Sequence, residues 1–466
     1  MGGFFGIVSQ NDCVNDLFYG TDYHSHLGTR RGGMAVVQPD GFKKSIHSIE
    51  TAQFRSKFAD DLAKFKGTMG IGVISDYEDQ PLLIASHLGN YAIATVGAVA
   101  NLAELTALEL KSRHGHFTEM NLNAINPTEL VASLINQEES FAAGLSKAQE
   151  VIKGSCSILI LTAEGIYAAR DRLGRTPLII GRRTDATAVA FESSAFPNLG
   201  FETAAYLGPG EVGFVSRDGY QTLVQPGEKL KICSFLWIYY GYPASSYEGI
   251  NVEQVRYRCG AALACADGVE VDMVSGIPDS GIAHAIGYAV EARLPYNRPF
   301  VKYTPTWPRS FMPQHQEMRD LIANMKLIPI SDLIAGKRML LCEDSIVRGT
   351  QLRDFVARLY AFGGAEVHMR VACPPLLYGC PYLNFSRSRS LMDLAARRAV
   401  IELLGSFPEE LAPFLDPSSD EYAAMTGIIR KRLGLTTLKY QTMPDMIKAI
   451  GLPCEKLCTF CWTGSE

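Results

Sequence analysis

The residues best suited to chemistry in this chain follow an apolar run at 338–342. Two acids, Glu343 and Asp344, come directly after that run, and a short loop of mostly small residues follows them. A helix is expected to begin near residue 351. Its first backbone N–H groups, with the hydroxyls of Ser345 and Thr350, form a site for a phosphate. Gly349 allows the backbone to approach that anion closely.

The whole segment at 340–350 closely resembles the 5-phosphoribosyl-1-pyrophosphate (PRPP) signature of type I phosphoribosyltransferases, particularly that of glutamine amidophosphoribosyltransferases. The alternative is an ordinary acid-rich strand-to-helix turn, but the strand–loop–helix context favours the motif. The resemblance implies that Glu343 and Asp344 bind the ribose, with Mg²⁺ held mainly through substrate oxygens. It also implies that the 5′-phosphate lies among Ser345, Ile346, Val347, Arg348, Gly349 and Thr350.

The resemblance continues along residues 231–390 and the last ten residues. The segment at 275–281 resembles the pyrophosphate loop of the family, which implies a PRPP-binding role for Asp279, Ser280 and Gly281. Lys302 and the segment at 309–311 resemble its flexible catalytic loop, so Lys302 and Arg309 are the expected catalytic residues. Further matches lie at residues 316, 319 and 325–327.

Two departures from the family pattern concern the same site. The segment at 303–308 is one residue longer than usual and carries two prolines, where the family has a polar, basic stretch. Proline stiffens a loop, and a loop that closes over substrate needs mobile hinges. Tyr242 stands where the family tends to have arginine. We therefore expect PRPP binding with a different nucleophile or slow turnover.

The first half resembles the glutaminase domain of the same family, but it lacks the nucleophile. The family's first mature residue is a cysteine, whose own α-amine serves as the base. Here Gly2 follows the initial methionine. The nearest thiol, Cys13, lies within the chain and needs a cleavage before it to gain a free amine.

Three further positions indicate that glutamine hydrolysis is lost. Ser75 replaces the arginine that binds the glutamine carboxylate, Val96 replaces the asparagine of the oxyanion hole, and Pro127 replaces the aspartate that holds the amine. Loss of one oxyanion-hole donor typically costs ~10²–10³ in rate. We predict a domain that keeps its fold without its reaction. It then serves as a scaffold or interaction surface, or its old pocket binds another ligand.

The cysteines suggest a metal centre. Cys458 and Cys461 have the two-residue spacing common in metal and iron–sulfur sites, although a single such pair is weak evidence. By resemblance to the cluster-bearing members of the family, Cys233 and Cys380 complete a set of four. We therefore expect a structural [4Fe–4S] cluster on these four cysteines, with zinc as the alternative. Four other cysteines are expected to be buried thiols without a metal: Cys259, Cys265, Cys342 and Cys373.

The elements that must position these residues change character along the chain. Apolar, β-branched segments at 69–75, 91–99 and 157–162 predict strands in the first half, with a helix at 127–136. Segments at 269–276 and 338–342 predict buried strands of a parallel sheet with helices on both faces. We expect an α+β N-terminal-nucleophile-hydrolase-like sandwich, the class II glutamine amidotransferase fold, over residues 1–230. An α/β type I phosphoribosyltransferase domain follows over 231–466.

Composition agrees with a globular protein of two or three domains. The chain has 466 residues, 47% hydrophobic and 20% charged, and a net charge of -5. That charge gives no reason to expect nucleic acid or an anionic membrane as a partner. The absence of a signal peptide and of a long apolar run predicts a cytoplasmic protein with reduced thiols.

The expected function is an amidophosphoribosyltransferase-like reaction without glutamine hydrolysis, as in purine biosynthesis. Ammonia or another amine would replace the pyrophosphate of PRPP, aided by Mg²⁺. The alternative is a non-catalytic regulator or subunit that senses PRPP or a purine nucleotide. The family resemblance implies a homo-oligomer, a dimer or tetramer, and the lost glutaminase leaves room for an ammonia-supplying partner protein.

Overall fold

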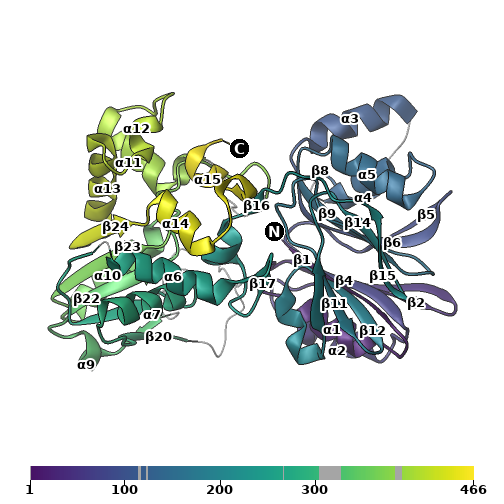
Figure 1. Cartoon of the computed structure of the whole chain (residues 1–466), viewed down its shortest axis with the longest axis horizontal. Coiled ribbons are helices and arrows are strands. Elements are labelled where there is room, and N and C mark those ends of the chain that lie inside the picture. Colours follow the sequence, from purple (N-terminus) through teal and green to yellow (C-terminus); the bar gives the residue numbers. More distant parts are fainter. Residues whose placement is uncertain are drawn as a thin grey trace.

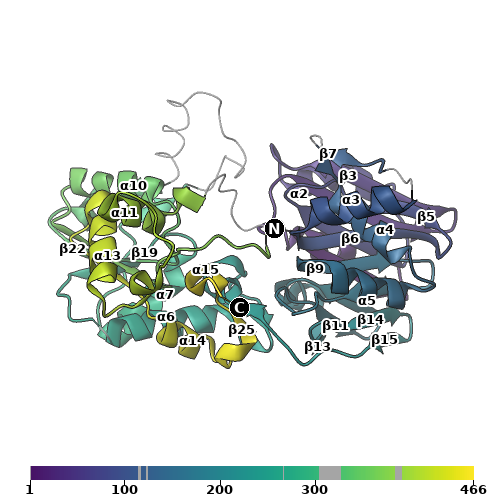
Figure 2. The ribbon, with the colours of Figure 1, turned by 90° about the horizontal axis from the view of Figure 1, so that it is seen from above.

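The computed structural model describes residues 2–113, 117–121, 124–265, 267–303, 327–383 and 391–465. Two units lie side by side, the N-terminal half at the right of Figure 1 and the C-terminal half at the left. Both ends of the chain lie near the junction of the units in Figures 1 and 2.

The N-terminal unit is built on two antiparallel sheets that pack face to face. One has the order β13-β11-β12-β1-β4-β2-β3 and the other β15-β14-β10-β9-β6-β5. The strands of the first are β1 (Gly3–Ser9), β2 (Arg31–Gln38), β3 (Gly41–Ser48), β4 (Met69–Ser75), β11 (Ile179–Arg183), β12 (Ala186–Ala190) and β13 (Glu202–Tyr206). Those of the second are β5 (Leu82–Ser86), β6 (Gly89–Val99), β9 (Gly154–Leu161), β10 (Ile166–Ala169), β14 (Val212–Ser216) and β15 (Gly219–Val224).

Helices cover the outer faces of these sheets and complete four layers. The α1 helix (Val14–Asp22) contacts β1 and β4, and α2 (Phe54–Leu62) contacts β3. On the other side α4 (Pro127–Ile135) and α5 (Phe141–Val151) contact strands of the second sheet. The α4 helix begins where Asn126 accepts a hydrogen bond from the backbone N–H of Thr128, with Pro127 at the first helical position. The α3 helix (Leu102–Arg113) and the short β7 (Met120–Asn121) and β8 (Ala124–Ile125) lie beside α4.

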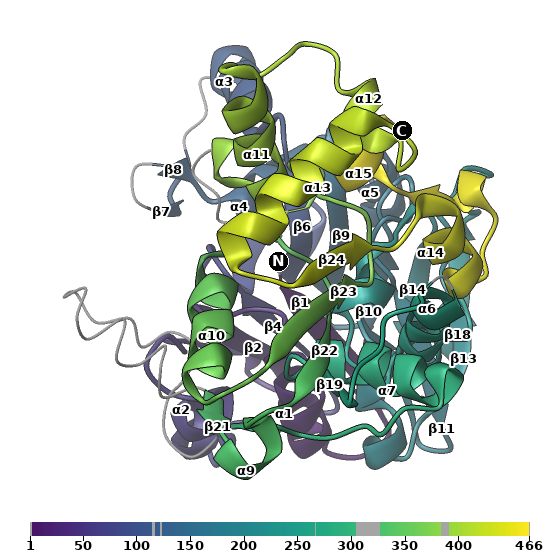
Figure 3. The same ribbon diagram turned by 90° about the vertical axis from the view of Figure 1, so that its left-hand side faces the viewer.

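The C-terminal unit is built on a parallel sheet of order β19-β22-β23-β24. Its strands are β19 (Met273–Gly276), β22 (Arg338–Glu343), β23 (Glu366–Val371) and β24 (Thr437–Tyr440). The helices α6 (Val252–Cys265) and α7 (Gly281–Ala292) lie on one side of these strands and α10 (Thr350–Ala361) on the other, as Figure 3 shows. The α13 helix (Asp420–Leu433) packs on α10 and β24.

Shorter elements connect the two units and extend the second. The strands are β16 (Ile232–Cys233), β17 (Ser246–Tyr247), β18 (Ile250–Asn251), β20 (Phe300–Lys302), β21 (Leu327–Pro329) and β25 (Leu457–Cys458). The helices are α9 (Ser331–Ile334), α11 (Ala395–Leu404), α12 (Ala412–Leu415), α14 (Met443–Ile450) and α15 (Phe460–Thr463). Single turns of other helix types are η1 (Ser193–Ala195), η2 (Pro197–Leu199), η3 (Leu236–Tyr240), η4 (Leu391–Asp393) and η5 (Cys454–Lys456).

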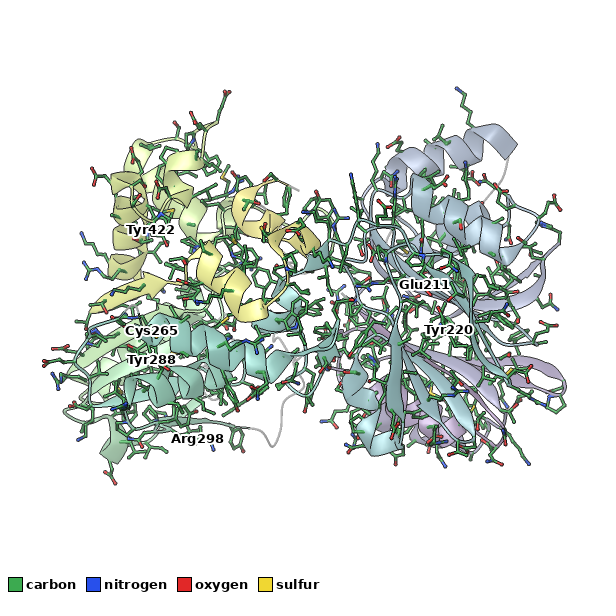
Figure 4. All side chains as sticks on the ribbon, viewed as in Figure 1. Glu211, Tyr220, Cys265, Tyr288, Arg298 and Tyr422 are labelled. Atoms are coloured by element: carbon green, nitrogen blue, oxygen red, sulfur yellow. The ribbon has the colours of Figure 1, made fainter. Side chains whose placement is uncertain are left out.

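The predicted fold class is confirmed, and so are the strands predicted at 69–75, 91–99, 157–162 and 338–342. The strand predicted at 269–276 begins only at Met273. Cys265 was expected to be a buried thiol, and this was wrong: the residue is exposed at the last turn of α6, as Figure 4 shows. Within the described residues, no helix combines the length and apolar character needed to cross a membrane.

Candidate active site

The first candidate site lies where the parallel strands β19 and β22 end. Gly276 is opposite Cys342 in the register of these strands, so the loops that follow them are adjacent. The Ser280 hydroxyl donates to one oxygen of Asp344, and the Ser345 hydroxyl donates to the other. Asp344 is 4% exposed. This buried carboxylate fastens the loop at 277–280 to the loop at 345–349.

Glycine permits both loops to take their shapes. Gly349 has a φ of 74° and stands immediately before α10, at the position that caps the helix. A Cβ at Gly281 would lie 2.4 Å from the carbonyl oxygen of Cys342, so only glycine fits where α7 begins against β22. Val347, Arg348 and Thr350 are exposed. The start of α10 therefore presents unpaired backbone N–H groups and a hydroxyl to solvent, which is an arrangement that binds phosphate.

The carboxyl group of Glu343 lies at the base of this site. Its Oε1 accepts a hydrogen bond from the Asp344 backbone N–H at 3.1 Å. Burial, and then the neighbouring Asp344, raise the pKa of Glu343 well above its usual range. Ionising Glu343 and Asp344 together is costly because their charges repel. The pair is therefore suited to a ligand that brings hydroxyl donors or a cation.

Lys302 reaches the same place from a separate element. It ends β20, which pairs with β21 in an antiparallel ribbon, and its ammonium forms an ion pair with Asp279. The structure thus brings the expected catalytic lysine to the expected pyrophosphate loop. Arg309, and the matches at 316, 319 and 325–326, lie outside the described residues, as do the prolines of the 303–308 segment.

The four candidate metal-binding cysteines converge at the junction of the two units. Cys233 in β16 lies opposite Cys458 in β25, because these strands pair in parallel. A hydrogen bond from Cys461, the largest influence, lowers the pKa of Cys380 to about 7. The Tyr378 backbone N–H donates to the Cys461 carbonyl at 3.2 Å. Three separated segments of the chain therefore place their thiols together.

Four thiols at one place are a donor set for either zinc or an iron–sulfur cluster. In the part of the chain that the structure describes, no group of three or more His, Cys, Asp or Glu side chains is placed so that it could hold a metal ion. Zinc binds each thiolate at about 2.3 Å, which requires four closely spaced sulfurs. Four cysteine thiolates are also the usual ligands of a [4Fe–4S] cluster. All four cysteines are free, so the donor set fits a cluster or zinc.

A second site is a cavity of about 330 Å³ in the N-terminal unit. All four positions expected to have lost their glutaminase residues line it: Gly2, Ser75, Val96 and Pro127. These four residues, which the family resemblance singled out, are far apart in the chain but line one cavity. Pro381, next to Cys380, contributes to its wall from the C-terminal half.

The cavity contains an acid that the sequence reasoning missed. Glu78 accepts a hydrogen bond from the Ser75 hydroxyl at 2.8 Å. Burial raises the pKa of Glu78, although the Ser75 bond opposes the shift. No periodicity or motif marks Glu78, which lies in a turn after β4. The Gln80 side chain, also unpredicted, fixes the backbone of Thr95 through bonds of 2.8 and 3.0 Å.

The thiols near this cavity do not replace a nucleophilic cysteine. Cys156 lines the cavity, but burial raises the pKa of its thiol strongly. Burial, with Asp12 and Asp16, raises the pKa of Cys13 to about 12. A neutral thiol is a poor nucleophile. Cys13 is also absent from the lining of the cavity.

The comparisons with known proteins agree with this architecture. A family model described as "Glutamine amidotransferase domain" matches residues 68–198. The amidophosphoribosyltransferase of Bacillus subtilis (strain 168) is 30% identical over an alignment that covers 99% of this chain and 93% of the relative. That of Methanocaldococcus jannaschii is 30% identical and covers 100% of this chain and 97% of the relative.

A solved structure extends the similarity to three dimensions. Glutamine PRPP amidotransferase from B. subtilis, complexed with ADP and GMP, superimposes with a TM-score of 0.83 at 27% identity, covering 99% of this chain and 96% of that chain. Fold and site together define a glutamine-amidotransferase-type sandwich joined to a phosphoribosyltransferase domain. With full-length relatives at 30% identity, this chain belongs to the amidophosphoribosyltransferase family.

Proposed function

We propose that this chain is a PRPP-binding, amidophosphoribosyltransferase-like protein of purine biosynthesis that uses ammonia or another amine in place of glutamine. The observation that carries the proposal is the joining of three elements at one site. The loop after β19, the loop after β22 and Lys302 from β20 meet through Asp344 and Asp279. The two loops resemble the pyrophosphate loop and the PRPP signature of the family, and Lys302 resembles a residue of its flexible catalytic loop.

The proposed reaction forms a bond between the amine nitrogen and the anomeric carbon and breaks the bond from that carbon to pyrophosphate. Residues 345–350 hold the 5′-phosphate, and Glu343 and Asp344 hold the ribose hydroxyls. Asp279, Ser280 and Gly281 line the pyrophosphate, and Lys302, with Arg309, balances its charge as it leaves. Mg²⁺, when bound with PRPP, neutralises part of the same charge.

The proposed loss of glutamine hydrolysis is supported by the composition of the N-terminal cavity. Hydrolysis by this class of domain needs a nucleophile, an oxyanion-hole donor and charged groups for the glutamine α-carbon. Gly2, Val96, Ser75 and Pro127 supply none of these. An acid, Glu78, now stands beside Ser75. The cavity therefore lacks, at these four positions, the groups that glutamine hydrolysis requires.

The four cysteines support a [4Fe–4S] cluster as the second part of the proposal. Cys233, Cys380, Cys458 and Cys461 would hold it, and it would tie the C-terminus to the junction of the units. Four cysteine thiolates are the usual ligands of such a cluster, and zinc on the same four thiolates is the alternative. Its proposed role is structural, because the reaction above transfers no electrons.

A non-catalytic regulator is the second candidate. The proline-containing segment at 303–308 favours it, because proline stiffens a loop that must close over substrate. A regulator of this kind would bind PRPP or a purine nucleotide without turnover. A homo-oligomer and an ammonia-supplying partner protein remain compatible with either candidate.

The test is pyrophosphate release from PRPP by anaerobically purified protein, with ammonium or glutamine as the nitrogen donor. We expect release with ammonium and none with glutamine alone. Release with glutamine would contradict the proposed loss of the glutaminase. PRPP binding, measured by calorimetry, without release from either donor would instead support the regulator.

A further inference from the structure

A tight turn of the N-terminal unit reaches the four-cysteine site. It connects β10 to β11, and the carboxylate of Asp171 accepts hydrogen bonds from the backbone N–H groups of Arg175 and Thr176 at 3.1 and 3.0 Å. The buried guanidinium of Arg170 donates to the carbonyls of Thr176 and Gly174, both at 2.8 Å. The turn is thus held from both sides, and Arg175 has a fixed position.

The backbone of this turn is bonded to the cysteine segment. The Cys233 N–H donates to the Arg175 carbonyl at 3.1 Å, and the Lys231 N–H donates to the Leu173 carbonyl at 2.7 Å. Because β16 also pairs with β25, Cys458 lies one strand further along the same ladder. The turn therefore continues the small sheet that carries two of the cysteines.

The side chain of Arg175 enters the cysteine site itself. Its guanidinium carbon lies 3.7 Å from the centre of the Tyr382 ring, two residues after Cys380. Its Nη1 donates to the Gly154 carbonyl at 3.5 Å, which holds the guanidinium from the side of β9. Arg175 is only 3% exposed, so this cation is removed from water next to the thiols.

The electrostatic partner of this buried cation would be the metal centre bound by the four thiolates. Four thiolates exceed the charge of a dipositive core, so a bound metal centre carries net negative charge. Burying such an anion is costly unless a cation or hydrogen-bond donors offset it. An arginine stacked on an aromatic ring provides both, since it stays charged and keeps several N–H donors in a fixed plane.

We propose that Arg175 is a positioning residue that completes the metal site from the N-terminal unit, as a buried counter-charge to the four thiolates, held in place by the Tyr382 ring and the backbone bond to Cys233. This inference rests on the four-cysteine metal site proposed above. It gives the N-terminal domain a role that needs no glutamine chemistry. The β10–β11 turn of that domain would then be part of the metal site.

The experiment compares Arg175→Gln with Arg172→Gln in full-length protein, purified anaerobically and reconstituted with iron and sulfide. Arg172 is a matched control because it is an exposed arginine in the same turn. We expect iron transfer to a ferrous chelator to be ~10–100-fold faster in Arg175→Gln, the usual effect of losing an outer-shell partner. The reduction potential should also fall, because the reduced and more negative cluster loses its counter-charge.

Arg175→Lys keeps the charge without the planar fork, so its chelation rate should lie between those of the wild type and Arg175→Gln. If Arg175→Gln fails to fold, Tyr382→Leu serves instead, because it removes the ring that holds the guanidinium. Wild-type chelation rate and potential in the folded variant would overturn the proposal. A reconstituted wild type without metal would overturn it as well, and pyrophosphate release would still test the phosphoribosyl reaction separately.

Discussion

At the scale of single residues, Glu343 controls how the proposed PRPP site responds to pH. Burial, and then Asp344, raise its pKa well above the usual range. Its carboxylate therefore forms at a higher pH than in the unfolded chain. Because the ionised form is the better acceptor for ribose hydroxyls and the better partner for Mg²⁺, PRPP affinity should increase as pH rises through this raised pKa.

Glu343→Gln tests this dependence. The amide cannot ionise, so we expect PRPP with Mg²⁺ to bind ~10-fold more weakly or worse at high pH, consistent with the loss of a charge-assisted hydrogen bond. We also expect affinity to change less with pH than in the wild type. Isothermal titration calorimetry over a pH series measures both. Glu409→Gln, an exposed acid on the same unit, should leave affinity and its pH profile unchanged.

Gly2 permits a second test at this scale. A Cβ at residue 2 would lie 2.3 Å from the backbone carbonyl oxygen of Ile74, so a cysteine cannot enter without displacing β4. The replacements at Ser75, Val96 and Pro127 are also still present in this variant. We therefore predict that Gly2→Cys produces no glutamate from glutamine, with Gly2→Ala as the steric control. Measurable glutamate formation by the cysteine variant would show that the remainder of the pocket is still competent.

At the scale of elements, the loop before α10 depends on one left-handed residue. Gly349 has a φ of 74°, and Gly363, just beyond the other end of α10, has a φ of 87°. Alanine at either position should lower the free energy of unfolding by ~1 kcal/mol, because a residue with a Cβ is strained there. Only Gly349→Ala should also weaken PRPP binding, since only that change alters the phosphate loop.

The pair of glycine variants separates strain from binding. Urea unfolding reports the stability of each variant, and calorimetry reports its PRPP affinity. A Gly349→Ala protein with wild-type affinity would argue against phosphate binding at the start of α10. Equal loss of affinity in Gly363→Ala would attribute the effect to general destabilisation of the helix.

The sequence predicted these elements well where pattern and motif coincide. The apolar run before Glu343, and the glycine and hydroxyl residues after it, indicate strand, loop and helix at once, and the structure has β22 ending at Glu343 and α10 beginning at Thr350. The sandwich was likewise predictable from the strands at 69–75 and 157–162. In these segments the local preference of the chain agrees with its tertiary environment.

Other parts of the site depend on contacts between distant segments and leave no local signal. Glu78 follows β4 as an ordinary turn acid, and only the fold places it in a cavity with Val96 and Pro127. Arg175 resembles its exposed neighbour Arg172 in sequence, but the pairing of its turn with β16 buries it against Cys233 and Tyr382. For Cys265 the error was the reverse: the residue was predicted to be buried and is exposed. A helical apolar pattern does not show which side of the last turn faces solvent.

At the scale of the whole molecule, a buried acid joins the two units. Glu192 follows β12 in the N-terminal unit and is fully buried. Its carboxylate accepts hydrogen bonds from the Tyr247 hydroxyl and from the backbone N–H of Tyr242 (3.1 Å), both in the C-terminal half. It also pairs with His26 at 2.9 Å. Burial alone would raise the pKa of Glu192, but His26 and the other partners outweigh it and lower the pKa to about 2.

This junction gives the last prediction. Glu192→Gln keeps the shape of the side chain but leaves Tyr247, Tyr242 and His26 without their anion, so the free energy of unfolding should fall by on the order of 3 kcal/mol at neutral pH. Because the pKa of Glu192 is lowered from 4.5 to about 2, its stabilising effect is complete above about pH 4.5 and disappears as pH falls toward 2.

Urea unfolding at decreasing pH should therefore show the wild type and Glu192→Gln converging in stability. The control Glu202→Gln, which changes an exposed acid on β13, should match the wild type throughout. A Glu192→Gln protein as stable as the wild type at neutral pH would mean that other contacts hold the units together, and that the charge of Glu192 is dispensable at their junction.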